Sequence, residues 1–431
     1  MRYESVRTTL ALLIVVCILL AGCSNADTAT SQKPQQIRFW IAPNEAEESF
    51  WKVAVARWNQ SGLGMPVTFT TIPTTGNSED AVLSSLVAGT EPDMSSNMFS
   101  GFAVQLANLK QLQPLSTMPG YQDLLDKRHM QDLIRNWTVN GNVYAIPIYS
   151  NPTLIWWRSD ILTKYGFDHA PRTYQDVYQL SRRYADAEHR YGFQVSAGRS
   201  WEDRWFDFIA YYYAASDGQP YITNGKAVFD NAAGLQVATF MDTMYRQGWT
   251  ARDFDSEDPL VSGLVAGASH GPWDIGRFQQ MYPDTMKHIV IGPMLTDATS
   301  GGRTATFADS KGIVLFKSSK VKNEAFAFIS WVLGNDQLNL LWLEKTGMLP
   351  ARADLLTNAV FAPYFATYPM ERIYAEYVNV AVPPALNENT IDIQKAMSLQ
   401  LVGALASGTK TPAVALADAV RQIDRLLQAH Q

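Results

Sequence analysis

The sequence predicts an α/β protein with at least two lobes. Its 431 residues exceed what one hydrophobic core usually organises. Hydrophobic residues account for 47% of the chain and charged residues for 18%, a balance that is typical of globular proteins. From Ile37 onward, strand-like runs alternate with helix-like runs in units of about thirty residues, which favours a mostly parallel, doubly wound sheet.

The first five elements follow this alternation. A helix over 46–59 would place Phe50, Val53, Ala54 and Trp58 on one face, and its acidic first turn suits the positive end of a helix dipole. Glycines after each helix supply the stop signals. The predicted strands are 37–41, 67–72 and a segment led by Pro92, and the predicted helices are 46–59 and 78–88.

The ends of the first three predicted strands are candidate ligand contacts. Ligands of parallel α/β sheets bind beyond the carboxyl ends of the strands. We therefore select the aromatic and polar residues at or just after these ends. They are Trp40, Asn44, Glu45, Thr75, Asn97 and Phe99.

The stretch 143–167 joins two α/β-like halves, and we interpret it as a crossover. Pro147 has no N–H to give to a strand ladder, which argues against an ordinary central strand. A turn and a β-branched, aromatic strand over 153–157 follow. Tyr149 and Asn151 lie where the chain changes direction, so both are candidate ligand contacts.

The chain beyond this strand contains further helices with predicted starts. Ser159 is expected to cap a short helix that stops at Gly166. Thr173–Asp176 has the spacing of a capping box, and Asp230 is expected to cap a long helix over 232–247.

The segment 201–213 is the densest aromatic cluster of the chain. Four of its residues recur at the spacing i, i+3, i+4 and i+7, which predicts a buried helix face. Trp201 precedes this predicted helix and is therefore a better ligand candidate, with Asp203 close by. The four residues of the face are Trp205, Phe208, Ile209 and Tyr212.

The N-terminus has the features of an exported lipoprotein. Two arginines precede the apolar run Leu10–Leu20, which is too short to span a bilayer. The residues Leu20-Ala21-Gly22-Cys23 resemble the lipobox of bacterial lipoproteins. We expect a signal peptide over 1–22, acyl chains such as palmitate on Cys23, and a flexible tether that completes the segment 23–36.

Composition excludes several classes of function. The formal net charge is −6 and no run of lysines and arginines occurs, which argues against nucleic-acid binding. Six scattered histidines without an HExxH pattern or cysteine pairs predict no metal site. The chain contains no GxxxxGK[ST] nucleotide loop, and we expect no cofactor.

Two features resemble catalytic sites. The segment 267–271, GASHG, matches the GxSxG pattern of a nucleophile elbow with Ser269 as nucleophile, but it lies in a glycine-rich region rather than between a strong strand and a helix. Asp203 and Asp274 would be a carboxylate pair for sugar hydrolysis, although 41 acidic residues make such pairs easy to choose. A secreted esterase or glycan-cleaving hydrolase and a purely structural surface lipoprotein are the alternatives to a binding protein.

Binding chemistry accounts for the predicted loops better than catalysis does. Recognition of a sugar requires flat aromatic faces for its C–H surfaces, and carboxylate, amide or guanidinium groups for its hydroxyls. The loops supply both kinds of group. The aromatic candidates are Trp40, Tyr149, Trp201 and Trp273, and the polar candidates are Asn44, Glu45, Asn151, Asp203, Asp274, Asp309 and Arg352.

Six segments between Arg38 and Leu356 resemble extracellular solute-binding protein family 1, the sugar-binding receptors of ABC importers. YAIPIYSNPTLIWWRSDILTKYGF resembles the family's crossover, and KNEAFAFISWVLGNDQLNLLWLEKTGMLPAR resembles its C-terminal helical stretch. The other four segments, in family order, are the strand at 37–41, LVAGTEPDM, LANLKQLQPL and APRTYQDVYQLSRRY.

The resemblance implies a periplasmic-binding-protein-like clamp of two hinged lobes, each a mostly parallel sheet flanked by helices. Each lobe would be discontinuous, with 37–147 plus 310–346 in lobe 1 and 148–309 plus 347–431 in lobe 2. A carbohydrate would bind between the lobes, and the closed receptor would dock on the transmembrane permease of an ABC transporter. The receptor would be a monomer outside the cytoplasm, held to the membrane by its lipid only. A protein of this fold for a non-sugar solute is a further alternative.

Overall fold

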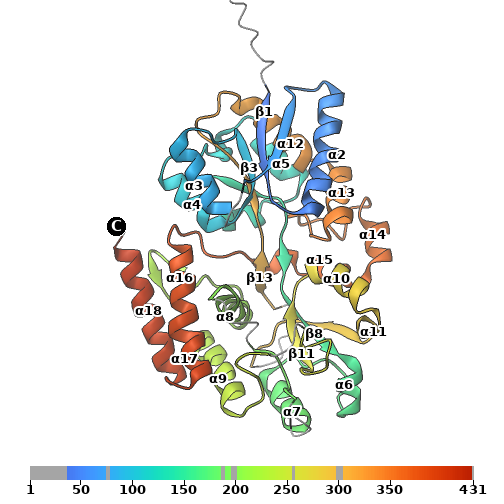
Figure 1. The fold of residues 1–431 in the computed structure, drawn as a ribbon, viewed down its shortest axis with the longest axis vertical. Coiled ribbons are helices and arrows are strands. Elements are labelled where there is room, and N and C mark those ends of the chain that lie inside the picture. Colours follow the sequence, from blue (N-terminus) through green and yellow to red (C-terminus); the bar gives the residue numbers. More distant parts are fainter. Residues whose placement is uncertain are drawn as a thin grey trace, which may run out of the picture. The chain divides into compact units, whose positions relative to one another are not determined.

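The computed structural model describes most of the chain from residue 36 onward (Figure 1). The predicted signal peptide, Cys23 and Thr75 lie outside the described residues. Among the helices of the described part, none has the length and apolarity needed to span a membrane. The described residues are 36–73, 78–185, 190–195, 201–254, 258–297 and 304–429, without the side chains of 201–204.

A five-stranded sheet combines three strands near the N-terminus with two strands from later parts of the chain. In order along the sheet, its strands are β2 (Val67–Thr71), β1 (Ile37–Ile41), β3 (Met94–Met98), β14 (Gly312–Leu315) and β6 (Ala145–Pro147). β1 is parallel to β2 and β3, whereas β14 is antiparallel to both of its neighbours. β14 is thus the one strand of this sheet that runs against the other four, and the predicted mostly parallel sheet is confirmed in these strand directions. Pro147 lies in the edge strand β6, where a missing N–H is tolerated.

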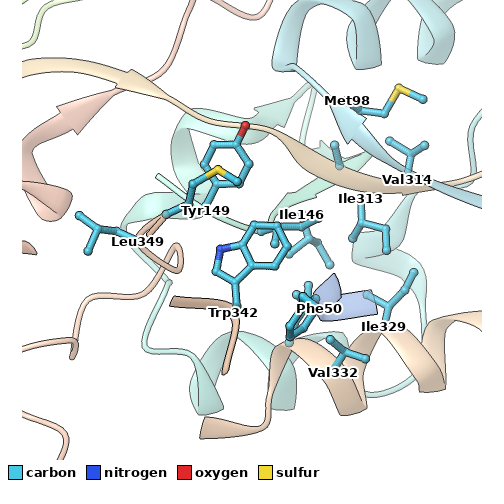
Figure 2. Close-up of a cluster of buried hydrophobic side chains, with 14 of the residues drawn as sticks. Phe50, Met98, Ile146, Tyr149, Ile313, Val314, Ile329, Val332, Trp342 and Leu349 are labelled. Carbon is cyan, nitrogen blue, oxygen red and sulfur yellow. The ribbon is translucent and has the colours of Figure 1, made fainter. Parts of the chain in front are cut away.

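Helices cover this sheet and supply most of its aromatic core. Phe39 of β1 meets Trp51 with ring centroids 4.7 Å apart, and Phe50 meets Trp342 at 5.1 Å, both edge to face. Figure 2 shows Trp342 between Phe50 and Tyr149. The helices are α2 (Glu45–Ser61), α3 (Ser78–Ala88), α4 (Ser100–Asn108), α5 (Tyr121–Lys127), α12 (Lys322–Leu333) and α13 (Asp336–Thr346).

A second sheet has β8 (Leu154–Arg158) at its centre, between β11 (Gly267–His270) and β12 (Ile289–Gly292). Both neighbours are antiparallel to β8, so the prediction of a mostly parallel sheet in this half is wrong. The reason is that β8 is buried along almost its whole length. A buried strand is apolar on both faces whether its neighbours are parallel or antiparallel, so its composition does not reveal their direction.

A small third sheet connects the other two. β13 (Thr306–Asp309) lies between β7 (Asn151–Pro152), to which it is antiparallel, and β15 (Ala381–Val382), to which it is parallel. Three residues separate β6 from β7, and two residues separate β13 from β14. Two hairpins complete the strands: β4 (Thr138–Val139) with β5 (Asn142–Val143), and β9 (Ile222–Thr223) with β10 (Lys226–Ala227).

Helices from distant parts of the chain pack around α8 (Trp201–Ala215), as Figure 1 shows. The predicted buried face of α8 is confirmed, because Trp205, Phe208, Ile209 and Tyr212 are each at most 5% exposed. Trp201 is the first residue of the helix rather than a residue before it, which corrects the prediction. α8 packs against α9 (Ala232–Arg246) and α16 (Thr390–Met397), and α9 packs in turn against α17 (Gly403–Ser407) and α18 (Pro412–Gln428).

The predicted helix caps have different outcomes. The capping box at Thr173–Asp176 is confirmed at the start of α7 (Tyr174–Tyr184). Asn231, not Asp230, caps α9, since its side chain accepts a hydrogen bond from the Gly234 N–H. Ser159 does not cap α6 (Ser159–Lys164), because it is already helical and its hydroxyl donates to the His288 carbonyl. The remaining helices are α10 (Trp273–Met281), α11 (Pro283–Met286), α14 (Ala362–Thr367) and α15 (Pro369–Ala375).

Candidate functional site

Three segments run side by side where the five-stranded sheet meets the small β7–β13–β15 sheet. The first leads from β6 to β7, the second from β13 to β14, and the third is 347–351. The Ile148 N–H donates to the Lys311 carbonyl at 2.9 Å, and the Ser150 N–H donates to the Leu349 carbonyl at 2.9 Å. Because their backbones are hydrogen-bonded to one another, we treat these segments as one unit and call it the crossing.

Six polar side chains from four parts of the sequence gather at the crossing. Lys311 lies on its second segment, and its ammonium donates to the Asn97 Oδ1 at 2.7 Å. Asn97 is the penultimate residue of β3, and it donates in turn to the Ser78 hydroxyl at 3.0 Å. Asp309 pairs with Asn151 across β13 and β7. We name this group the crossing cluster: Glu47, Asn97, Tyr149, Asn151, Asp309 and Lys311.

Asn97 has a backbone conformation that indicates a functional position. Its φ angle is +67°, in the left-handed region that non-glycine residues seldom occupy. Such strain persists only where surrounding contacts determine the conformation, and it concentrates at functional sites. The contacts here are the hydrogen bonds of Asn97 to Lys311 and Ser78. Asn97 therefore fixes the Lys311 ammonium beside the carboxylates.

The two carboxyl groups of the crossing cluster have unusual acidities. Glu47 lies in the first turn of α2 and is 5% exposed. Burial raises its pKa to about 7, against the attraction of Lys311 and with help from the charge of Asp309. Burial also raises the pKa of Asp309, and Lys311 opposes this change. Near neutral pH the cluster therefore holds groups that can both donate and accept hydrogen bonds.

Replacing Glu47 by glutamine should raise the melting temperature relative to wild type at about pH 8 but not at about pH 5. The ordinary pKa of a glutamate carboxyl, which applies to the unfolded chain, is 4.5. The pKa of Glu47 in the folded protein is about 7. Between these values the folded state holds a proton that the unfolded state lacks. The stability that this proton contributes is complete below the lower pKa and is lost as pH rises through the upper one. Glutamine resembles the neutral acid at every pH.

Thermal unfolding of both proteins at the two pH values measures this effect. Glu48→Gln is the matched control, because Glu48 is exposed on the same helix turn. A difference in melting temperature between Glu47→Gln and wild type that does not change with pH would contradict the raised pKa.

Tyr149 and Asn151 tie the crossing to its surroundings. The Tyr149 ring stacks on Trp342 with centroids 6.0 Å apart (Figure 2). Burial and the charges of Asp309 and Glu47 raise the Tyr149 pKa well above its usual value, so the phenol stays protonated. The Asn151 Oδ1 accepts from the Leu349 N–H at 3.0 Å. The Asn151 Nδ2 is buried, and within the described residues it has no hydrogen-bond partner.

Trp273 lies on the wall of a cavity that Gly347, the first residue of the third crossing segment, also lines. It begins α10 and is 39% exposed. A Cβ on Gly271 would lie 2.1 Å from its ring, so the ring rests against this glycine. The cavity has a volume of about 700 Å³, and we call it the Trp273 cavity. Its walls come from α10, α13, α14, α15 and the segments next to them.

Asp274 is engaged in a local ionic network. Its carboxylate lies 2.8 Å from the His270 Nδ1 and 3.3 Å from an Arg277 nitrogen, and Arg277 also contacts Asp258 at 3.1 Å. Burial would raise the Asp274 pKa, but the contacts with His270 and Arg277 hold it below its usual value. Asp274 is therefore an ionised carboxylate with protein partners.

The structure does not bring Arg352 to the crossing cluster. Its side chain is 0% exposed, and its guanidinium binds Asp354 at 2.6 and 2.8 Å and Asp336 at 2.7 Å. It also lies over the Phe361 ring, 4.9 Å from the centroid. Because every face of the group is used inside the protein, we assign Arg352 a structural role and withdraw it from the candidate ligand contacts.

The other predicted contacts have varied placements. The Asn44 side chain is occupied as the N-cap of α2, where it accepts from two backbone N–H groups. Glu45 is exposed in the first turn of that helix, and Trp40 and Phe99 are half-buried against the core. Trp201 and Asp203 are in α8, and their side chains lie outside the described residues, as does Thr75.

The GxSxG segment has a packing explanation. It forms strand β11, so Ser269 and His270 point to opposite faces of the sheet. Within the described part, the Ser269 hydroxyl has no hydrogen-bond partner. A Cβ on Gly267 would lie 2.3 Å from the Trp157 ring, which parallels the role of Gly271 under Trp273. The glycines therefore make room for two tryptophans, and the geometry of an esterase triad is not formed by these residues. Elsewhere in the described residues, no group of three or more His, Cys, Asp or Glu side chains is placed to hold a metal ion.

Sequence reasoning missed Glu47 and Lys311. Both are adjacent to predicted contacts, since Glu47 follows Glu45 by two residues and Lys311 follows Asp309 by two. The signal for Glu47 was its position in the first turn of a predicted helix. The signal for Lys311 was its position just after a predicted crossing. Neither signal reveals that the charge of Lys311 acts on Glu47, because the two residues are more than two hundred residues apart in the sequence.

The two main sheets and the crossing between them define a two-lobe α/β binding protein of the periplasmic type. Residues 54–367 match the family described as bacterial extracellular solute-binding protein. The chain therefore belongs to this family of extracytoplasmic binding proteins.

Relatives with named ligands support this assignment. The arabinooligosaccharide-binding protein of Bacillus subtilis is 22% identical over 366 residues, which cover 81% of each protein. A maltodextrin-binding protein of the same organism is 24% identical over 261 residues, which cover 55% of this chain and 59% of the relative.

Solved structures share the fold. An uncharacterised protein of Listeria monocytogenes has a TM-score of 0.85 and 29% identity, over 91% of this chain and all of the other. The binding protein for cyclic alpha-maltosyl-1,6-maltose from Arthrobacter globiformis has a TM-score of 0.77 and 18% identity, over 92% of this chain and all of the other.

Proposed function

We propose that this protein is the extracytoplasmic receptor of an ABC importer and that it captures a mono- or oligosaccharide between two hinged lobes. Membership of the solute-binding family carries the receptor role. The carbohydrate assignment is supported by relatives named as binding proteins for arabinooligosaccharides and maltodextrins. The receptor then delivers its ligand to a membrane permease.

The crossing is the proposed hinge. We divide the chain into 37–147 plus 310–346 for lobe 1 and 148–309 plus 347–431 for lobe 2. Ligand closes the lobes because it binds the closed arrangement more tightly than the open one. Strand β6 and strand β14 belong to the sheet of lobe 1, whereas β7 and β13 belong to the small sheet, which supports a hinge between them.

The crossing cluster has suitable chemistry for sugar hydroxyls. Asp309 and ionised Glu47 accept hydrogen bonds, and Lys311 and the free Asn151 Nδ2 donate them. Paired donors and acceptors match the adjacent hydroxyls of a sugar, which act as both. Aromatic faces that pack against the C–H surfaces complete the proposed site, with Trp40, Phe99, Trp201 and Trp273 as candidates.

We assign the protein a binding role without catalysis. Support comes from the family and from relatives that are named as binding proteins, together with the strand geometry of Ser269 and His270. We further propose that Cys23 carries the lipid, that the segment 23–36 is the tether, and that the receptor is a monomer. Mass spectrometry of the purified protein tests the lipid, and sedimentation tests the monomer.

Isothermal titration calorimetry against a panel of neutral sugars tests the carbohydrate assignment. The panel contains arabinose, maltose and their oligomers, with a polyamine and inorganic phosphate as non-sugar comparisons. We expect binding heat with at least one sugar. Binding of a non-sugar solute, together with no heat from any sugar, would exclude a carbohydrate receptor.

Asp309→Asn should weaken sugar affinity by about 1 to 1.5 kcal/mol, since a hydrogen bond to a charged acceptor becomes one to a neutral acceptor. The amide has the same shape, so the melting temperature without ligand should change little. Titration with the tightest sugar of the panel measures the loss. Asp123→Asn, an exposed substitution on α5, is the control and should leave affinity unchanged. Equal affinity of Asp309→Asn and wild type would place the sugar elsewhere.

A further inference from the structure

The Trp273 cavity combines aromatic faces with acidic side chains. Its walls include the rings of Trp273, Tyr364 and Tyr368 and the carboxyl groups of Glu344 and Glu371. The volume of about 700 Å³ is in the range of small-molecule sites. This combination differs from the crossing cluster, which has an ammonium group between its carboxylates.

Glu371 is the most unusual group of the cavity. Its side chain belongs to a residue that is 6% exposed, and its Oε2 has no hydrogen-bond partner among the described residues. Burial raises the pKa of this carboxyl, which shows that its ionised form is poorly solvated there. A buried acceptor without a partner costs about 1 to 3 kcal/mol, and more when it is charged. A ligand that donates to the Oε2 would remove this cost.

The two tyrosines form an aromatic wall next to Glu371. Their ring centroids are 4.6 Å apart with an angle of 39° between the planes. Burial and the charges of Glu371, Tyr368 and Glu344 raise the Tyr364 pKa, so this phenol remains neutral. Trp273 faces the same cavity with 39% of its surface exposed. The negative faces of such rings attract cations, most strongly for tryptophan.

The charges of the cavity also favour a cation. Within the described part, neither Glu344 nor Glu371 forms an ion pair, although Lys345 lies on the same wall. Lys345 is exposed and does not reach either carboxylate within ion-pair distance among the described contacts. A positive charge would favour the ionised form of Glu371, against the effect of burial, and would offset both carboxylates.

We propose that the Trp273 cavity binds an alkylammonium group, with Glu371 as its anionic partner and Trp273, Tyr364 and Tyr368 as its aromatic wall. Two kinds of molecule carry such a group: an amino sugar, and a small free amine or quaternary ammonium ion, of which the quaternary ion offers its charge but no N–H donor. Trp273 is also a candidate for the carbohydrate site, but this proposal does not rest on the carbohydrate assignment, because Glu371, Tyr364 and Tyr368 carry it.

Calorimetry with matched ligand pairs tests this proposal on the purified protein. The pairs are glucosamine with glucose, and choline and putrescine with ethylene glycol. We expect at least one cation to bind and its neutral counterpart not to compete with it. Glu371→Gln should weaken the affinity for that cation at least tenfold. Glucosamine alone identifies an amino sugar, and choline or putrescine identifies a free cation. Absence of binding by every cation, or cation binding that Glu371→Gln leaves unchanged, overturns the proposal.

Control variants separate this site from the crossing cluster. Tyr368→Ala removes one ring of the aromatic wall and should lose affinity for the cation. Glu324→Gln, an exposed change on α12, should have no effect. Neutral-sugar binding that fails in Asp309→Asn but persists in Glu371→Gln belongs to the proposed carbohydrate site. Neutral-sugar binding that fails in Tyr368→Ala but not in Glu371→Gln assigns the cavity to a neutral ligand and overturns the cation proposal.

Discussion

Replacing Arg352 by methionine should lower the free energy of unfolding by about 3 kcal/mol. The guanidinium is fully buried and forms a bidentate contact with Asp354 and a second contact with Asp336. Methionine retains packing against Phe361 but leaves two carboxylates without a counter-charge. Burial would raise the Asp354 pKa, but hydrogen bonds from Arg352 and Asn358 hold it low, so the bonded carboxylate stabilises the folded state. Urea denaturation measures the change.

A matched surface variant shows how much of the lost stability comes from removing a charge that is buried rather than from removing a charge at all. Arg421→Met removes the exposed partner of Asp418 and should cost less than about 1 kcal/mol. Ligand affinity of the folded Arg352→Met protein should equal that of wild type, because the side chain does not reach the crossing cluster. A loss of affinity with full stability would return Arg352 to the ligand contacts.

Trp205→Ala should destabilise the protein by about 3 to 5 kcal/mol. Trp205 is 5% exposed, and its ring meets Phe307 of β13 edge to face at 5.5 Å. Truncation would open a cavity between α8 and the strand that ends at Asp309. The cost follows from the lost burial and from the incomplete collapse of the surroundings. Denaturant unfolding of the protein without ligand measures it.

The same substitution at Trp273 is the control for Trp205→Ala. Trp273 is 39% exposed, so its truncation should cost clearly less stability than that of Trp205. Similar losses of stability for the two variants would contradict the inference that the more exposed Trp273 contributes less to stability than Trp205. A small loss for Trp205→Ala would contradict its place in the core.

The sequence identified part of the crossing cluster and missed its charge balance. Tyr149, Asn151, Asn97 and Asp309 were predicted because each follows a strand or lies at a change of chain direction. Lys311 could not be assigned, since a single lysine after a strand has no local signature of a buried partner. Such a partner is provided by Asn97, from a strand more than two hundred residues earlier.

Local patterns in the sequence determined the helices, most strand positions and the family. The buried face of α8, the capping box of α7 and the edge position of Pro147 all follow from the spacing or chemistry of neighbouring residues. These features depend on contacts within a few residues, which the sequence contains directly.

Only the tertiary structure decided the strand directions around β8, the burial of Arg352 and the attraction between Lys311 and the Glu47 carboxyl. Each depends on elements that are far apart in the chain and are brought together by the crossing. A charged side chain has the same local pattern whether it is solvated or buried, so its partners and its pKa are set by the packing of distant segments.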